Sequence, residues 1–164
     1  MKILSFLLTL SFSLYSSEPK NNEFKFDEVA YGTGYGYFES YGLDQTGNSE
    51  NYDVHLMSVP KEEMTNKFDY ILLDLNSDNS GNVSTGMYKF LASDNKVIQN
   101  FTFNSASVLI NYDVNTYSGD VYFAIDGTVE VKKKKDTYTL SYDLLLENGK
   151  VVTGNYEGSL KDWN

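Results

Sequence analysis

The sequence predicts an all-β protein, built as a single antiparallel meander of about eight strands that closes into a barrel, with a β-sandwich as the alternative. Three observations lead to this prediction. Apolar and polar residues alternate with period two, most regularly in VYFAIDGTVEV (121–131) and TYTLSYDLLL (137–146). Helical periodicity is almost absent, and clusters of turn-forming residues recur at short intervals. Strands with one apolar and one polar face are typical of antiparallel sheets.

The N-terminal residues predict a secretory signal peptide. Met1 and Lys2 give a short positive start, an apolar run follows, and Ser16 and Ser17 are small residues suited to cleavage. The run is too short to span a membrane, and a buried N-terminal strand or helix is the alternative. We therefore expect a secreted or periplasmic protein with a signal peptide over 1–17, a flexible segment over 18–24 and one β-barrel domain over 25–164.

The strands are expected in a simple order along the domain. Their approximate ranges are 26–39, 51–58, 68–76, 86–92, 97–112, 121–131, 137–146 and 150–160. Turn sequences separate them at 42–51, 76–82, 92–95 and 147–150, and only 58–66 indicates a helical turn. In the strand at 121–131, alternation places five apolar residues on one face: Val121, Phe123, Ile125, Val129 and Val131.

Charge and composition narrow the classes of partner. The chain has a net charge of −10, contains no Arg and contains no Cys. An acidic surface repels nucleic acid and anionic membranes, so we expect neither as a partner and no direct membrane insertion. Without Arg the chain lacks the bidentate group that proteins favour for phosphate and carboxylate. Without Cys it has neither disulfides nor the cysteine of a lipid anchor.

The C-terminal half resembles a sequence pattern of secreted and lipid-anchored envelope proteins of Bacteroidetes. The resemblance rests on GTVEV (127–131), YTLSYDL (138–144) and NGKVVTGNYEGSL (148–160), with GMYKF (86–90) before them. Two features depart from the pattern, since the lipobox cysteine is absent and Lys132–Lys135 replaces a small turn. The resemblance implies an all-β envelope protein of the lipocalin-like or calycin-like barrel type. It implies no catalytic residue.

Few residues indicate catalysis or metal binding, and we expect no cofactor. His55 is the only histidine, and without a nucleophile motif near it we expect a histidine on the wetter face of a strand. Asp74, Asn76 and Asp78 have the alternate spacing of calcium ligands, but the glycine and glutamate of a calcium loop are missing. A polar turn is the favoured interpretation, with a weak calcium site as the alternative. Lys132–Lys135 is interpreted as a solvated hairpin tip rather than an anion site.

Aromatic residues are the most distinctive feature, with 14 Tyr and 10 Phe. In YGTGYGYF (31–38) the glycines alternate with bulky residues, so we interpret this stretch as a strand that bends to close the barrel and adds tyrosines to its interior. Inward-facing tyrosines imply either an internal hydrogen-bond network or a lined cavity. The candidate ligand-binding residues are Tyr35, Tyr37, Tyr52, Tyr70, Tyr138, Tyr142 and Tyr156.

Three functions compete on these grounds. The first is a secreted, monomeric, non-enzymatic protein that binds a small apolar or glycan-like ligand in a tyrosine-lined barrel. The second is a structural or adhesin-like envelope protein with a filled core and a protein partner. The third, a carbohydrate hydrolase with two carboxylates, is disfavoured because the sequence indicates no pair. Whether the interior is open or packed separates the first two.

Overall fold

The computed structural model describes residues 22–45, 47–65, 67–92 and 98–164, so the expected signal peptide and most of the expected turn at 92–95 lie outside the described residues. The described part is all-β apart from one turn of 3-10 helix at Lys61–Glu63. Its strands are β1 (Glu23–Phe26), β2 (Val29–Gly32), β3 (Tyr35–Leu43), β4 (Ser49–Met57), β5 (Phe68–Asp78), β6 (Gly86–Phe90), β7 (Thr102–Asp113), β8 (Ser118–Lys134), β9 (Thr137–Leu146), β10 (Val151–Gly158) and β11 (Leu160–Asp162).

These strands form one mixed sheet that curls into a half-barrel, in the order β11-β3-β4-β5-β7-β6-β8-β9-β10-β1-β2. The all-β prediction is confirmed, but the prediction of a single antiparallel meander of about eight strands is wrong. The described residues form eleven strands, and two pairs are parallel: β6 with β7 and β11 with β3. β6 enters between β7 and β8 at one end of the sheet, whereas β7 and β8 pair directly at the other end.

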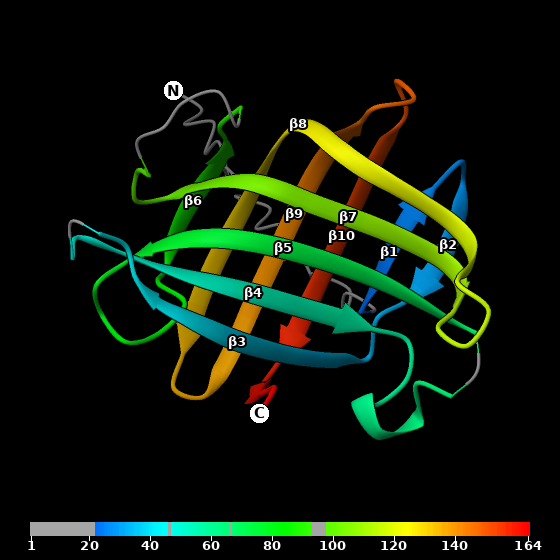
Figure 1. The fold of residues 1–164 in the computed structure, drawn as a ribbon, viewed down its shortest axis with the longest axis horizontal. Coiled ribbons are helices and arrows are strands. Elements are labelled where there is room, and N and C mark those ends of the chain that lie inside the picture. Colours follow the sequence, from blue (N-terminus) through cyan, green and yellow to red (C-terminus); the bar gives the residue numbers. More distant parts are fainter. Residues whose placement is uncertain (1–21, 46, 66, 93–97) are drawn as a thin grey trace, which may run out of the picture.

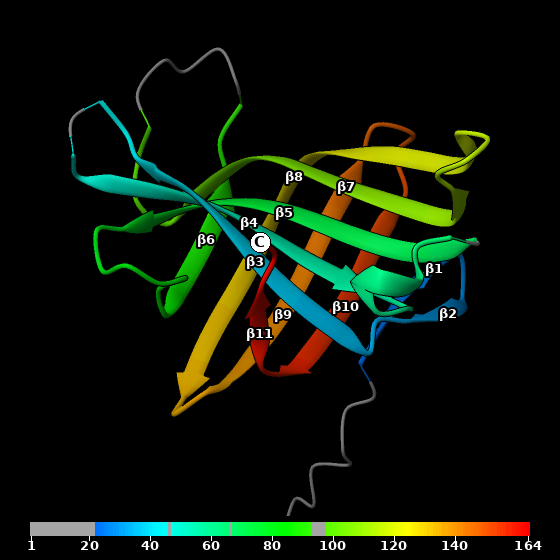
Figure 2. The ribbon, with the colours of Figure 1, turned by 60° about the horizontal axis from the view of Figure 1, so that its bottom comes forward.

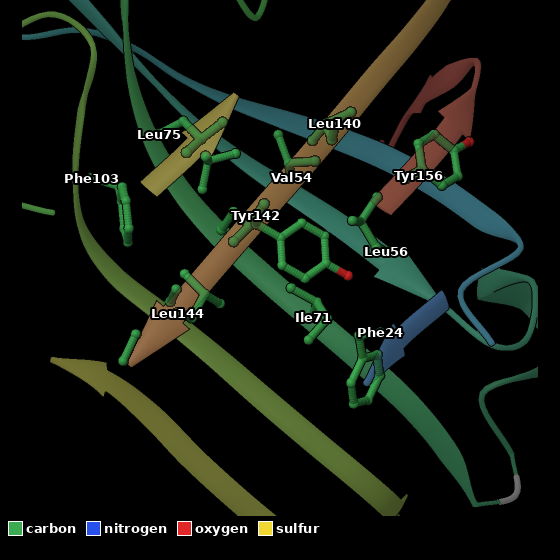
Figure 3. Packing of buried hydrophobic residues seen from close by; sticks show 14 of the residues in the cluster. Phe24, Val54, Leu56, Ile71, Leu75, Phe103, Leu140, Tyr142, Leu144 and Tyr156 are labelled. Carbon is green, nitrogen blue, oxygen red and sulfur yellow. The ribbon is translucent and has the colours of Figure 1, made fainter. Parts of the chain in front are cut away.

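The curled sheet faces itself across a single main core. In Figure 1, β3, β4, β5 and β7 cross in front of β9, β10 and the second half of β8. Apolar side chains from both sides fill the space between them, and Figure 3 shows Leu56 and Ile71 of the front strands meeting Leu140, Tyr142 and Leu144 of β9. The alternation predicted for β9 is confirmed, because its even-numbered residues are buried throughout.

The expected strand at 26–39 is three strands, since the chain reverses after β1. Asp27 and Glu28 both have positive φ, which makes a tight hairpin between β1 and β2. The prediction that 31–38 is one strand that closes a barrel is wrong, because the stretch is divided between β2 and β3 and the described strands form a half-barrel. β3 pairs with the C-terminal β11, which is an edge strand of the sheet (Figure 2). A Cβ at Gly36 would lie 2.5 Å from the Tyr156 ring, so a larger residue there would displace the side chains that pack against β3.

The tyrosines of β3, however, do not face the main core, and this part of the prediction is wrong. Gly36 is paired with Leu56 and Phe38 with Val54, so the even-numbered residues point inward. Tyr35 and Tyr37 therefore lie on the outer face of the sheet. The bare side of the strand receives Tyr156 from β10, which is why the bulky residues of β3 are on the opposite side.

The strand β8 also departs from its predicted alternation. Val129 and Val131 are buried as expected, but Val121, Phe123 and Ile125 are exposed on the outer face. A β-bulge between residues 124 and 126 inserts one residue, and the side facing the core changes there. A simple alternation pattern carries no sign of such an insertion.

Candidate functional site

Four of the seven candidate tyrosines are part of the packed interior. Tyr52, Tyr138, Tyr142 and Tyr156 are each at most 6% exposed and belong to the main core cluster. Aliphatic residues surround the Tyr142 ring (Figure 3). The side chains of these tyrosines therefore fill the space between the two halves of the sheet.

The buried hydroxyl groups of the core differ in how they are satisfied. The Tyr88 hydroxyl lies 2.6 Å from the Ser77 hydroxyl and donates to the Ser84 carbonyl at 2.8 Å. The hydroxyls of Tyr52 and Tyr142 are buried without a hydrogen bond of standard geometry among the described residues. Burial raises the pKa of both phenols, so they stay neutral.

Three of the candidate tyrosines border one shallow hollow at the junction of β3 and β11. The hollow has a volume of about 230 Å³ and lies beside Tyr35, Tyr37 and Tyr156, with Lys161 at its edge. Tyr35 is 40% exposed, whereas Tyr37 is buried under the 3-10 turn and accepts a hydrogen bond from the Lys61 backbone N–H at 3.0 Å. One exposed aromatic ring beside a lysine could hold a small polar ligand.

The seventh tyrosine, Tyr70, was expected to face inward, and this is wrong. It lies on the outer face beside His55, whose Nδ1 is 2.6 Å from its hydroxyl. The Trp163 ring stacks on the imidazole, with ring centroids 4.1 Å apart, and the Lys61 ammonium lies 4.7 Å from the centroid of the indole ring. His55 lies on the outer face of its strand but is only 5% exposed, so the expectation of a histidine on the wetter, solvent-facing side is wrong.

The contact with Trp163 buries the His55 imidazole and so changes its pKa. Burial and, secondarily, the positive charge of Lys61 lower the pKa of His55 to about 4, so the imidazole is neutral at physiological pH. Sequence reasoning missed this arrangement because Trp163 is 108 residues away along the chain, and only the parallel pairing of β11 brings it to β4.

Three carboxylates form a row across the outer face beside this aromatic cluster. Glu39, Asp53 and Asp74 occupy paired positions on β3, β4 and β5. Burial, followed by repulsion from Asp74, raises the pKa of Asp53 to about 6. The Tyr41 hydroxyl donates toward Glu39 and Asp53 at 3.2 Å, and Asn51 donates to Asp74. Side chains of the same sheet therefore already bind these carboxylates.

The calcium candidate residues lie along one strand rather than around a loop. β5 continues to Asp78, beyond the turn expected from residue 76. Alternate residues of a strand are about 6.6 Å apart, so Asp74, Asn76 and Asp78 cannot converge on one ion with ligand distances near 2.4 Å. Asn76 contacts Asn51 and Thr102, and Asp78 accepts from Ser84. No cluster of three metal-ligating His, Asp or Glu residues occurs in the described ranges.

The clearest unpartnered feature is an apolar surface on the outer face of β7–β10, which we call the outer apolar belt. Phe123 and Ile125 are each 51% exposed, and Val151 is 49% exposed. Register connects the strands, since Leu109 is paired with Val121 and Leu145 with Val151. The belt consists of Leu109, Val121, Phe123, Ile125, Leu145 and Val151.

Comparisons with known proteins add no family. The chain matches no family model, and no curated protein or solved structure is significantly similar to it. Among the residues that the structure describes, no helix has the length and apolar character needed to span a bilayer.

Proposed function

We propose that this chain is an exported, non-enzymatic interaction protein that contacts a protein partner through the outer face of its half-barrel. The observation that carries the proposal is where the apolar side chains lie. The interior is filled by side chains from both halves of the sheet, whereas Phe123 and Ile125 lie half exposed on the outside. Exposed, contiguous apolar surface on a soluble domain marks sites of association.

The acidic row supports a non-enzymatic function. Asp53 has the raised pKa expected of a general acid, but Tyr41 donates to its carboxylate, and Asn51 binds Asp74 beside it. A general acid must reach the proton-accepting atom of a substrate. Here the carboxylates lie on a sheet face and bond to their neighbours, which is the arrangement of a structural hydrogen-bond network.

Site-specific photo-cross-linking tests the proposal in the cells that produce the protein. We expect a benzophenone side chain at position 123 to form a discrete adduct with another protein. The same group at position 43, where Leu43 is 52% exposed on β3 and several strands away from β8 in the sheet, should not give that adduct. Identical adduct patterns from both positions, or none from position 123, would contradict the proposal.

The hollow beside Tyr35 supports a second candidate function, the binding of a small glycan-like ligand at the surface. Its volume of about 230 Å³ suits one sugar-sized group, and Tyr35 offers an exposed ring for stacking. Screening on a glycan array tests this candidate. A hit should be lost in Tyr35→Ala and kept in Tyr117→Ala, and a glycan that binds both variants equally occupies another site.

A further inference from the structure

Acidic side chains border the outer apolar belt. Asp126 lies beside Ile125 on β8, Asp143 precedes Leu145 by two residues on the same face of β9, and Glu147 follows that strand. All three carboxylates are exposed, and none forms an ion pair within the described part of the chain. They are therefore available to cationic groups that approach the belt.

Lysines near the belt offset this charge only in part. Lys132 is paired with Glu130 at 2.8 Å, and Lys150 is paired with Asp27. Lys89 on β6 is exposed nearby, opposite Thr128. Lys25 on β1 is also exposed on this face, opposite Thr153. The three carboxylates of Asp126, Asp143 and Glu147 outnumber these two lysines, so the border of the belt is negative.

A hollow of about 220 Å³ adjoins the belt where β6, β8 and β9 lie side by side. Met87 forms an apolar wall, and Glu130 and Asp143 lie on its other sides. An apolar wall with carboxylates at the rim suits the long aliphatic stem and charged end of Lys or Arg. The outer face of β8 thus passes from apolar residues at 121–125 to acidic surroundings at 130.

A second copy of this chain is a poor occupant for the belt. The chain carries a net charge of −10, and a symmetric contact would bring the acidic border of one copy against that of the other. A partner with cationic side chains around an apolar centre would meet both features of this surface.

We propose that the outer apolar belt docks a partner protein whose contact surface has exposed aliphatic or aromatic side chains flanked by Lys or Arg. One of these cationic side chains enters the hollow beside Met87 and pairs with Asp143, because Glu130 on the other side is already paired with Lys132. The inference rests on the proposed function and specifies the chemistry of the partner.

Designed β-hairpin peptides provide defined probes for this chemistry. One hairpin carries Val, Phe and Ile on one face with Lys at the flanking positions. A second replaces each Lys by Glu, and a third replaces the apolar residues by Ser. Binding to the full-length protein is measured by fluorescence anisotropy at about 30 mM and about 300 mM NaCl, which changes the screening of exposed charges. We expect only the first hairpin to bind, and to bind less tightly at high salt.

Variants of the belt assign the binding to this surface. Phe123→Ser should weaken binding of the Lys hairpin by about tenfold at both salt concentrations. Asp143→Asn should weaken binding by about threefold at low salt and reduce its salt dependence. Leu43→Ser, an exposed apolar-to-polar substitution on β3, several strands away from β8, is the matched control and should leave the affinity unchanged. Asp143→Asn is nearly isosteric, so it tests the inference even if Phe123→Ser alters folding.

The inference would be overturned if the Lys and Glu hairpins bound with equal affinity, or if the Lys hairpin did not bind detectably. It would also be overturned if Phe123→Ser and Asp143→Asn both left the affinity for the Lys hairpin unchanged. A concentration-dependent dimer that Phe123→Ser abolishes would also overturn it, because a second copy would then occupy the belt. That last result leaves the proposed function standing, whereas the absence of cross-links at position 123 contradicts the proposed function itself.

Discussion

Gly127 is the residue whose replacement tests the account of β8 most sharply. Gly127 follows the β-bulge in β8, and its φ is 148°. Before the bulge the even-numbered residues of β8 face the core, and after it the odd-numbered residues do. A Cβ there would approach the Asp143 carbonyl oxygen more closely than real Cβ atoms approach other atoms, and would lie 3.0 Å from Leu144 Cα. Both neighbours are backbone atoms of β9, which cannot move without disrupting its pairing with β8. Gly127→Ala should therefore destabilise the fold.

The magnitude follows from three contributions to the free energy of unfolding. A non-glycine residue in this conformation costs about 1–3 kcal/mol. The steric conflict with β9 costs a further amount of about 1–3 kcal/mol. The lower entropy of the unfolded alanine chain returns about 0.4–1 kcal/mol. We expect a net loss of about 3 kcal/mol, which is a large part of the stability of a typical domain.

Urea denaturation monitored by circular dichroism measures this loss by linear extrapolation. Gly34→Ala is the matched control, because a Cβ at Gly34 would meet no atom within 4 Å and the residue has no positive φ. It should leave the free energy of unfolding within about 1 kcal/mol of the wild type. Equal stability of Gly127→Ala and the wild type, or equal loss in both variants, would refute the reasoning.

Three further predictions concern buried polar groups. Tyr88→Phe should cost about 1–3 kcal/mol in urea denaturation, because it removes both hydrogen bonds of a buried hydroxyl and leaves the Ser84 carbonyl without its donor. The Ser77 hydroxyl still accepts from the Ser84 N–H. Tyr142→Phe should cost less, because its hydroxyl has no hydrogen bond of standard geometry, and the reverse order would contradict the hydrogen-bond assignments. The pKa of Asp53 is raised to about 6 in the folded protein, so ionising this carboxyl destabilises the fold, and its contribution to stability falls as pH rises from 4 to 6. The pKa of His55 is lowered to about 4, so the fold favours the neutral imidazole, and the contribution of His55 to stability rises from pH 4 to 6.5. Asp53→Asn should therefore make the free energy of unfolding rise more steeply with pH between 4 and 6. His55→Gln should remove the rise that His55 contributes between pH 4 and 6.5. A pH profile of stability that neither substitution changes would refute the shifted pKa values of both residues. Trp163→Ala should raise the pKa of His55 toward 6.5, measured by NMR titration, and a value that stays near 4 would show that the indole does not cause the shift.

Local alternation predicted the all-β class and the buried faces of several strands. Leu140, Tyr142 and Leu144 on β9 and Val152 on β10 are buried as expected, because period-two patterning reflects which side of a strand faces the core. The position of each strand in the sheet was harder to predict. The parallel pairing of β11 with β3 joins residues from opposite ends of the domain, and no local pattern encodes such a contact.

The candidate site illustrates the same limit. The alternation on β3 correctly placed Tyr37 and Gly36 on opposite faces of the strand. It could not show which of the two faces points toward the core, because aromatic residues lie on both faces of this sheet. The outer aromatic cluster around His55 depends on Trp163, whose position against β4 no local sequence pattern encodes. On β8 a single inserted residue moved Phe123 from the predicted core to the surface.

Methyl NMR of the full-length protein tests the central claim most directly, namely that the interior is filled and the outer face is the binding surface. The lipophilic probe 1-N-phenylnaphthylamine is titrated while isoleucine, leucine and valine methyl signals are followed. We expect that the methyl signals of Ile71, Leu140 and Leu144 do not shift, whereas those of Val121 and Ile125 do. Saturable shifts of the core methyls, with the belt methyls unchanged, would contradict it.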